Sequence, residues 1–80
     1  MSQTGTTKEE RFIVAVLKKA LELGGPRHSV DRYAVGTSIG LHARGIDTIC
    51  NQLAQANFIK KQGERMIQLT PQGEELVNNI

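Results

Sequence analysis

The side chains best suited to recognition chemistry lie between residues 44 and 65. Five polar residues recur three or four positions apart, or next to one another: Arg44, Asp47, Thr48, Asn51 and Gln52. On a helix, this spacing places them on one face. Guanidinium and amide groups form paired hydrogen bonds with the edges of guanine and adenine in the major groove of DNA. If the partner is duplex DNA, we expect Arg44 to contact guanine and Asn51 or Gln52 to contact adenine.

Three cations follow this segment: Lys60, Lys61 and Arg65. Cations of this kind bind phosphate groups or enter a narrow minor groove. Residues 27–65 hold six basic and three acidic side chains, and the rest of the chain holds four basic and five acidic ones. The positive charge of the chain, which is +2 overall, is therefore concentrated in the middle. The alternative is a solvated surface whose charges are distributed by chance.

The scaffold for these side chains is predicted by hydrophobic spacing. Apolar residues at i, i+3, i+4 and i+7 predict a helix from Arg44 or Gly45 to about Ala56, and they form its inward stripe: Ile46, Ile49, Cys50 and Leu53. Asn57 is suited to a left-handed conformation at the end of this helix. Two short strands, residues 58–61 and 66–69, are then expected around a turn at residues 62–65.

Three further helices are expected from their capping residues. Thr7 and Glu10 have the spacing of a capping box and begin a helix that runs to about Leu23. Asp31 is a good N-cap for a second helix that ends near Ile39, and Thr70 followed by proline begins a short last helix. Residues 27–30 could contribute a brief strand, and residues 1–6 are expected to be a disordered tail.

Gly36 lies inside the second helix, where glycine costs about 1 kcal/mol relative to alanine. The close approach of a neighbouring helix is the structural reason that we expect for it.

Three segments together resemble the winged helix-turn-helix domains of MarR-like regulators: VGTSIGL at 35–41, LAQANFI at 53–59 and LTPQGEEL at 69–76. The resemblance implies an α+β, mainly α, winged helix domain over residues 7–80. It would have a three-helix core, a wing hairpin of two or three strands, and a short C-terminal helix. It further implies a small transcriptional regulator that binds double-stranded DNA with sequence preference. Helix 44–56 would enter the major groove and wing 60–65 would contact phosphate or the minor groove.

The fold does not determine the partner, because winged helices also dock proteins and some bind RNA. The uncharged amide-rich face and Asp47 favour the alternative of a protein-interaction module that docks through this face or through the first helix. RNA binding is the third hypothesis, and the shortage of exposed aromatic residues argues against it.

No catalytic constellation is found, and we expect neither an enzyme nor a cofactor. Asp47 and Glu64 make no credible acid–base pair. His28, His42 and Cys50 lack metal-ligand spacing, so no metal site is expected, and Cys50 is interpreted as a buried core thiol. No apolar run approaches the length of a membrane span, and a single cysteine suits a reducing compartment, so we expect a cytoplasmic protein.

The first helix is apolar almost all the way round between Phe12 and Leu17. This surplus suggests a homodimer through four residues of the first helix, with help from the C-terminal segment: Phe12, Ile13, Val16 and Leu17, with Leu76, Val77 and Ile80. The alternative is that Phe12 and Val14 cover the last helix within one subunit.

Overall fold

The computed structural model describes residues 7–80, so the tail expected over residues 1–6 lies outside the described range. The first helix, α1 (Lys8–Leu23), begins at the predicted capping box. The Thr7 hydroxyl accepts a hydrogen bond from the Glu10 N–H at 3.1 Å, and the Glu10 carboxylate accepts one from the Thr7 N–H at 3.0 Å. Two N–H groups that the helix itself leaves without partners are thereby satisfied.

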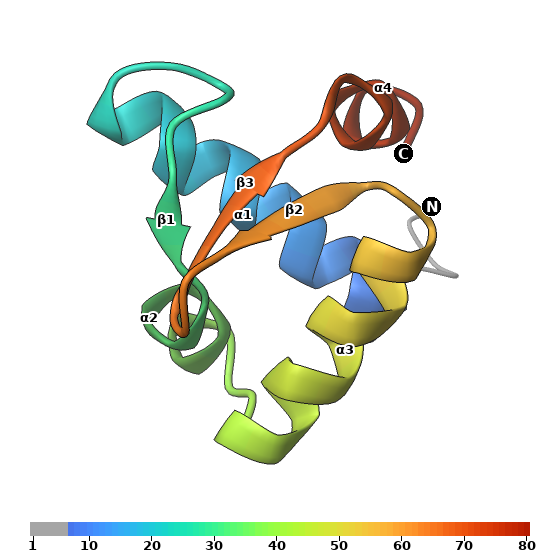
Figure 1. Cartoon of the computed structure of the whole chain (residues 1–80). Coiled ribbons are helices and arrows are strands. Elements are labelled where there is room, and N and C mark those ends of the chain that lie inside the picture. The colour runs from blue at the N-terminus through green and yellow to red at the C-terminus, as the bar shows by residue number, and fades with distance from the viewer. Residues whose placement is uncertain (1–6) are drawn as a thin grey trace.

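Six further elements follow in the predicted order. They are β1 (Val30–Asp31), α2 (Arg32–Ser38), α3 (Ala43–Gln55), β2 (Ile59–Gln62), β3 (Met66–Leu69) and α4 (Pro71–Asn78). The strands form one antiparallel sheet in the order β1-β3-β2, which leaves β2 at an edge. In Figure 1, α1 passes behind the sheet, α2 and α3 lie below it, and α4 lies near the N-terminal end of α1. The mainly helical α+β architecture is therefore confirmed.

α3 carries the inward stripe that the sequence predicts. Ile46 and Cys50 are completely buried, and Ile49 and Leu53 are at most 5% exposed. The helix begins slightly earlier than expected, after His42, whose side chain makes no capping hydrogen bond. It ends at Gln55, and Asn57 has the predicted left-handed backbone, with φ at 64°. The opposite side of α3 must therefore face solvent.

Three of the four α1 residues that the sequence suggests for a homodimer interface lie in the core of the chain. Phe12, Ile13 and Val16 are completely buried within the chain, and Leu17 is half-buried. The physical reason is that α1 lies at the centre of the molecule. It contacts α2, α3, α4, β1 and β3, and therefore needs apolar side chains around most of its circumference.

Two glycines mark the closest approaches between elements. A Cβ atom on Gly36 would lie 2.4 Å from the Ile46 side chain, so this glycine lets α2 pack against α3, as predicted. A Cβ atom on Gly73 would lie 1.9 Å from the carbonyl oxygen of Phe58. This second approach brings α4 against the chain at the start of β2.

Candidate nucleic-acid interface

The exposed side of α3 is a single stripe of polar side chains. Its members recur at i, i+4, i+7 and i+11, directly opposite the buried stripe: Arg44, Thr48, Asn51 and Gln55. Gln52, also exposed, lies on one flank, and Asp47 lies on the other. The Thr48 hydroxyl donates to the Arg44 carbonyl at 3.1 Å and can still accept a hydrogen bond from outside. The stripe thus offers donors and acceptors along three turns.

The two lysines of β2 extend this surface with positive charge. Successive side chains of a strand point to opposite faces, so Lys60 faces solvent and Lys61 points to the side where α3 packs. The Lys61 ammonium group emerges between strand and helix, where it donates a hydrogen bond to the Asn51 side-chain oxygen. This contact joins the polar stripe of α3 to the edge strand.

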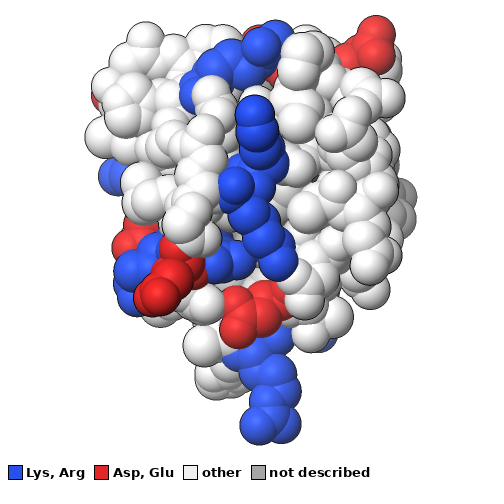
Figure 2. Space-filling view, in the orientation of Figure 1, with Lys and Arg blue, Asp and Glu red and all other residues white. Residues whose placement is uncertain are grey.

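A hollow of about 630 Å³ lies between β2, the end of α3 and the start of α4. Three cations line it, Arg27, Lys60 and Lys61, and no carboxylate does. Figure 2 shows basic side chains in a column along this face, with acidic groups near its lower end. We call the side chains of Arg27, Lys60 and Lys61 the basic column.

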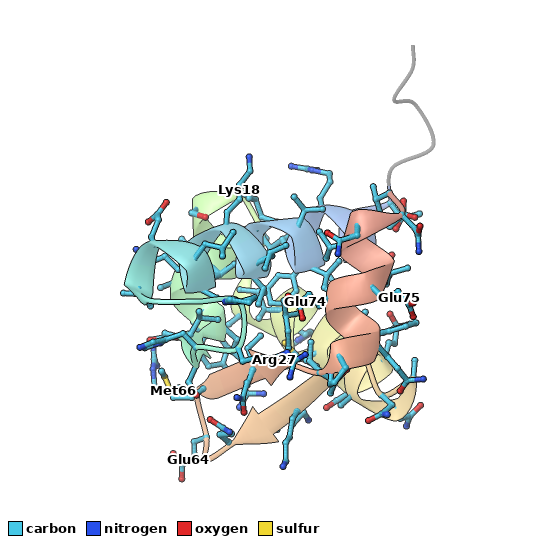
Figure 3. The ribbon with its side chains drawn as sticks, turned by 90° about the horizontal axis from the view of Figure 1, so that it is seen from above. Lys18, Arg27, Glu64, Met66, Glu74 and Glu75 are labelled. Atoms are coloured by element: carbon cyan, nitrogen blue, oxygen red, sulfur yellow. The ribbon has the colours of Figure 1, made fainter. Side chains whose placement is uncertain are left out.

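Arg27 is a site residue that the sequence reasoning missed. It precedes β1, more than thirty positions before the lysines, and no motif connects them. Its guanidinium group donates two hydrogen bonds to Glu74 Oε1 of α4, at 3.2 and 3.0 Å, and Figure 3 shows the two side chains facing one another. The only sequence signal was its inclusion in the basic middle of the chain.

Asp47 is engaged within the protein. The Tyr33 hydroxyl of α2 donates a hydrogen bond to Asp47 Oδ1 at 2.5 Å, and this bond raises the pKa of the Tyr33 hydroxyl. Asp47 therefore ties α2 to α3. Its charge also lies close to the stripe, where it would repel a phosphate group.

Arg65 is also held by the protein itself. Its Nε and Nη2 atoms donate to Asp31 Oδ2 at 3.1 and 3.0 Å, and its guanidinium carbon lies 4.9 Å from the centroid of the Tyr33 ring. Partial burial raises the pKa of Asp31, but hydrogen bonds from Arg65 and from the N–H groups of Tyr33 and Ala34 outweigh it and lower the pKa overall. Arg65 is brought near α2 rather than into the basic column.

Arg32 adds to the basic residues of the sequence, but its side chain is buried and adds no cation to the surface. The residue is only 7% exposed, and its Nη2 atom donates to the Glu64 carbonyl oxygen at the turn of the hairpin. Its backbone N–H donates to the Arg65 carbonyl at 2.9 Å. Arg32 thus holds the hairpin turn against α2 and is unavailable to a partner.

Three other possibilities for residues 7–80 are a metal site, a reactive thiol and a membrane span. No three histidine, cysteine or acidic side chains are grouped as a metal ion would require. Burial raises the pKa of the Cys50 thiol, which keeps it protonated and unreactive. None of the described helices combines the length and apolar character needed to cross a bilayer.

Comparisons of the chain with models of protein families, with curated proteins and with solved structures found no match. The interpretation of the site therefore depends on the geometry of this chain alone.

Proposed function

We propose that the chain is a winged helix-turn-helix domain that binds double-stranded DNA, as a small transcriptional regulator would. α3 would lie in the major groove, which is the groove wide enough for a helix and which presents a distinct pattern for each base pair. The hairpin of β2 and β3 would act as the wing, with the basic column against the phosphate backbone.

The observation that carries this proposal is the junction between Lys61 and Asn51. Lys60 and Lys61 have no acidic partner within residues 7–80. The junction places these two cations beside an exposed stripe of amide and hydroxyl groups. Arg44, the third such cation on this face, lies in the first turn of α3. Specific recognition of DNA needs both kinds of group, because phosphate contacts position a protein and base contacts specify the sequence.

Within this proposal, the roles of the site residues differ. Among the described residues, the side chains of Arg44, Thr48 and Gln52 form no hydrogen bond or ion pair with another element, so they would contact base edges directly. Gln55 would join them, because it lies on the same exposed stripe. Lys61 and Asn51 would act as a pair. Asp47 and Arg65 would act mainly by fixing α2 and the hairpin turn, because each already has an intramolecular partner.

A titration with a duplex of about 12 base pairs at low salt tests the proposal. We expect amide shifts in residues 44–55 and 60–61. The slope of log K against log salt should be roughly −3, since the three side chains of the basic column can each contact a phosphate group. Changing Arg44, Lys60 and Lys61 together to alanine should weaken binding at least about tenfold.

The matched control changes Lys8, Lys18 and Lys19 together to alanine. It removes the same charge from exposed positions of α1 and should leave most of the affinity intact. If both triple variants lose affinity equally, the interaction depends on net charge alone and this interface is the wrong one. Absence of duplex binding by the unaltered protein would favour the protein-docking alternative.

A further inference from the structure

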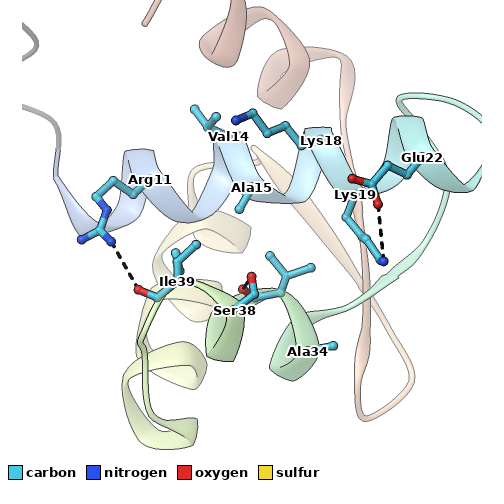
Figure 4. Close-up of a pocket in the computed structure, with 10 residues that line it drawn as sticks. Arg11, Val14, Ala15, Lys18, Lys19, Glu22, Ala34, Ser38 and Ile39 are labelled. Carbon is cyan, nitrogen blue, oxygen red and sulfur yellow. Dashed lines mark hydrogen bonds and ion pairs between the residues drawn. The ribbon is translucent and has the colours of Figure 1, made fainter.

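A second surface lies between α1 and α2, on the side away from the hairpin. It is a groove of about 530 Å³. Figure 4 shows α1 and α2 in front with the hairpin behind them, whereas the hairpin is in front of α1 in Figure 1. The groove and the candidate DNA interface therefore face in different directions.

The floor of the groove is apolar. Ala15 of α1 points toward α2 (Figure 4), and Val35 of α2 and Ile39 just after it line the groove from the other side. Val14 lies at the edge of the groove, on the side of α1 away from α2. Val14, Ala15 and Ile39 are half-buried, so each would lose further contact with water if a partner covered it. The Ser38 hydroxyl also lines the groove and donates a hydrogen bond to the Val35 carbonyl at 2.6 Å. Its proton therefore needs no acceptor from a partner.

The rim of the groove is basic. Arg11, Lys18 and Lys19 line it together with a single acidic residue, Glu22. The Lys19 ammonium group lies 3.5 Å from the Glu22 carboxylate, so these two charges compensate one another. Among the described residues, Lys18 has no acidic partner, and the Arg11 guanidinium group donates a single hydrogen bond, at 3.3 Å to the Ile39 carbonyl. The remaining charge of the rim is positive.

The groove has the length of a helix contact. Its α1 side is formed by residues 11, 14, 15, 18, 19 and 22, which recur over three turns and span about 16 Å. A helix laid along such a groove inserts side chains at i, i+3, i+4 and i+7. Apolar residues at these positions would meet the floor, and acidic residues beside them would meet Arg11 and Lys18.

We propose that this groove docks an acidic amphipathic helix of a partner protein. The apolar floor would supply most of the affinity, and the basic rim would select acidic over basic partners, because charge complementarity acts mainly on specificity and on the rate of association. Since the groove and the candidate DNA interface face in different directions, docking and DNA binding are compatible in this proposal.

The probe is a synthetic peptide of about 18 residues with leucine and alanine on one helical face and glutamate on the other. A matched peptide carries lysine in place of glutamate. We expect the acidic peptide to shift the amide signals of residues 11–22 and 34–39, and the basic peptide to bind at least about tenfold more weakly. Equal binding of both peptides, or binding of neither, would overturn the proposal.

Two pairs of variants locate the site. Ala34→Gln, at an exposed position lining the groove, should weaken binding of the acidic peptide about tenfold, whereas Thr37→Gln, exposed on the same helix but outside the groove, should not. Lys18→Glu should weaken it and Lys60→Glu should not. If Ala34→Gln and Thr37→Gln behave alike, the peptide binds elsewhere.

Octanoate tests whether the groove binds small carboxylates instead of a helix. If octanoate shifts the amide signals of residues 11–22 and 34–39 and the acidic peptide does not, the groove binds small carboxylates and the proposal is wrong.

Discussion

The Asp31 side chain has two structural roles. Its carboxylate caps α2 by accepting hydrogen bonds from the N–H groups of Tyr33 and Ala34, at 2.9 and 3.4 Å, and it holds Arg65. These bonds lower its pKa in the folded protein. The ionised form therefore stabilises the fold above the ordinary pKa of 3.8, and this contribution is lost as the pH falls through the lowered folded-state value.

Asp31→Asn should remove this pH dependence. Asparagine is itself a good N-cap, so at pH 7 we expect a loss of at most about 1 kcal/mol, mainly from the exposed ion pair with Arg65. Urea unfolding between pH 7 and pH 3 measures the free energy of unfolding of both proteins. The value for the unaltered protein should fall toward that of the variant in acid. Glu75→Gln, at an exposed position, is the matched control for charge. Parallel pH profiles of the unaltered protein and the Asp31 variant would contradict the assignment.

The same variant bears on DNA binding. Releasing Arg65 and removing a nearby negative charge should raise duplex affinity severalfold and make the salt slope steeper by about one unit. This outcome would show that the hairpin turn is restrained by Asp31. An unchanged affinity and slope would mean that Arg65 contributes nothing even when it is released.

Residue roles on this surface were only partly predictable from the sequence. Spacing alone identified the outward stripe of α3, because helix periodicity determines which side chains share a face. It could not identify that Arg65 pairs with Asp31, that Tyr33 binds Asp47, or that Arg32 is buried, since these contacts join segments that only the tertiary fold brings together.

At the scale of elements, glycines determine how closely helices and strands pack. Gly73 faces the backbone of Phe58, which cannot move aside, whereas Gly36 faces the side chain of the buried Ile46. Gly45, in the first turn of α3, has no atom within 4 Å of the position that a Cβ would take. The three positions therefore separate the effect of close packing from the ordinary helix preference for alanine.

Three alanine substitutions should give a ranked series. Gly73→Ala should lower the free energy of unfolding by about 2–3 kcal/mol, and Gly36→Ala by about 1–2 kcal/mol, because each added methyl group overpacks a filled site. Gly45→Ala should raise it by about 0.5–1 kcal/mol. Chemical denaturation of the three variants measures the order, and a neutral Gly73→Ala would show that α4 does not press on Phe58 as the structure indicates.

The order and type of the elements were predictable because their signals are local. Capping residues, hydrophobic spacing and proline determined the helices at Thr7, Asp31 and Thr70. The approach at Gly73 was not predictable, because nothing near it in the sequence indicates that Phe58 lies against it. The same holds for the membership of Arg27 in the basic column.

At the scale of the whole molecule, the exposed apolar side chains decide whether two copies of the chain can form a stable dimer. A stable interface buries about 800 Å² on each partner, which is roughly a sixth of the 4806 Å² that this chain exposes. The exposed large apolar side chains are dispersed: Leu21 and Leu23 end α1, Met66 lies on the hairpin, and Ile80 ends the chain. α4 lies near the opposite end of α1 from Leu21 (Figures 1 and 3), so these residues form no contiguous patch.

We therefore expect the chain to be a monomer of 8.8 kDa in solution, contrary to the homodimer suggested by the apolar first helix. The reason is that Phe12, Ile13 and Val16 already stabilise the core, and a side chain buried in its own subunit cannot also bury surface in a partner. Light scattering coupled to size exclusion, over a dilution series from about 100 μM, measures the mass directly. A mass near twice this value that falls on Leu21→Glu would establish dimerisation through the end of α1. A monomer would present a single α3 to DNA, and its salt slope would be about half that of a dimer, because the slope scales with the number of phosphate contacts.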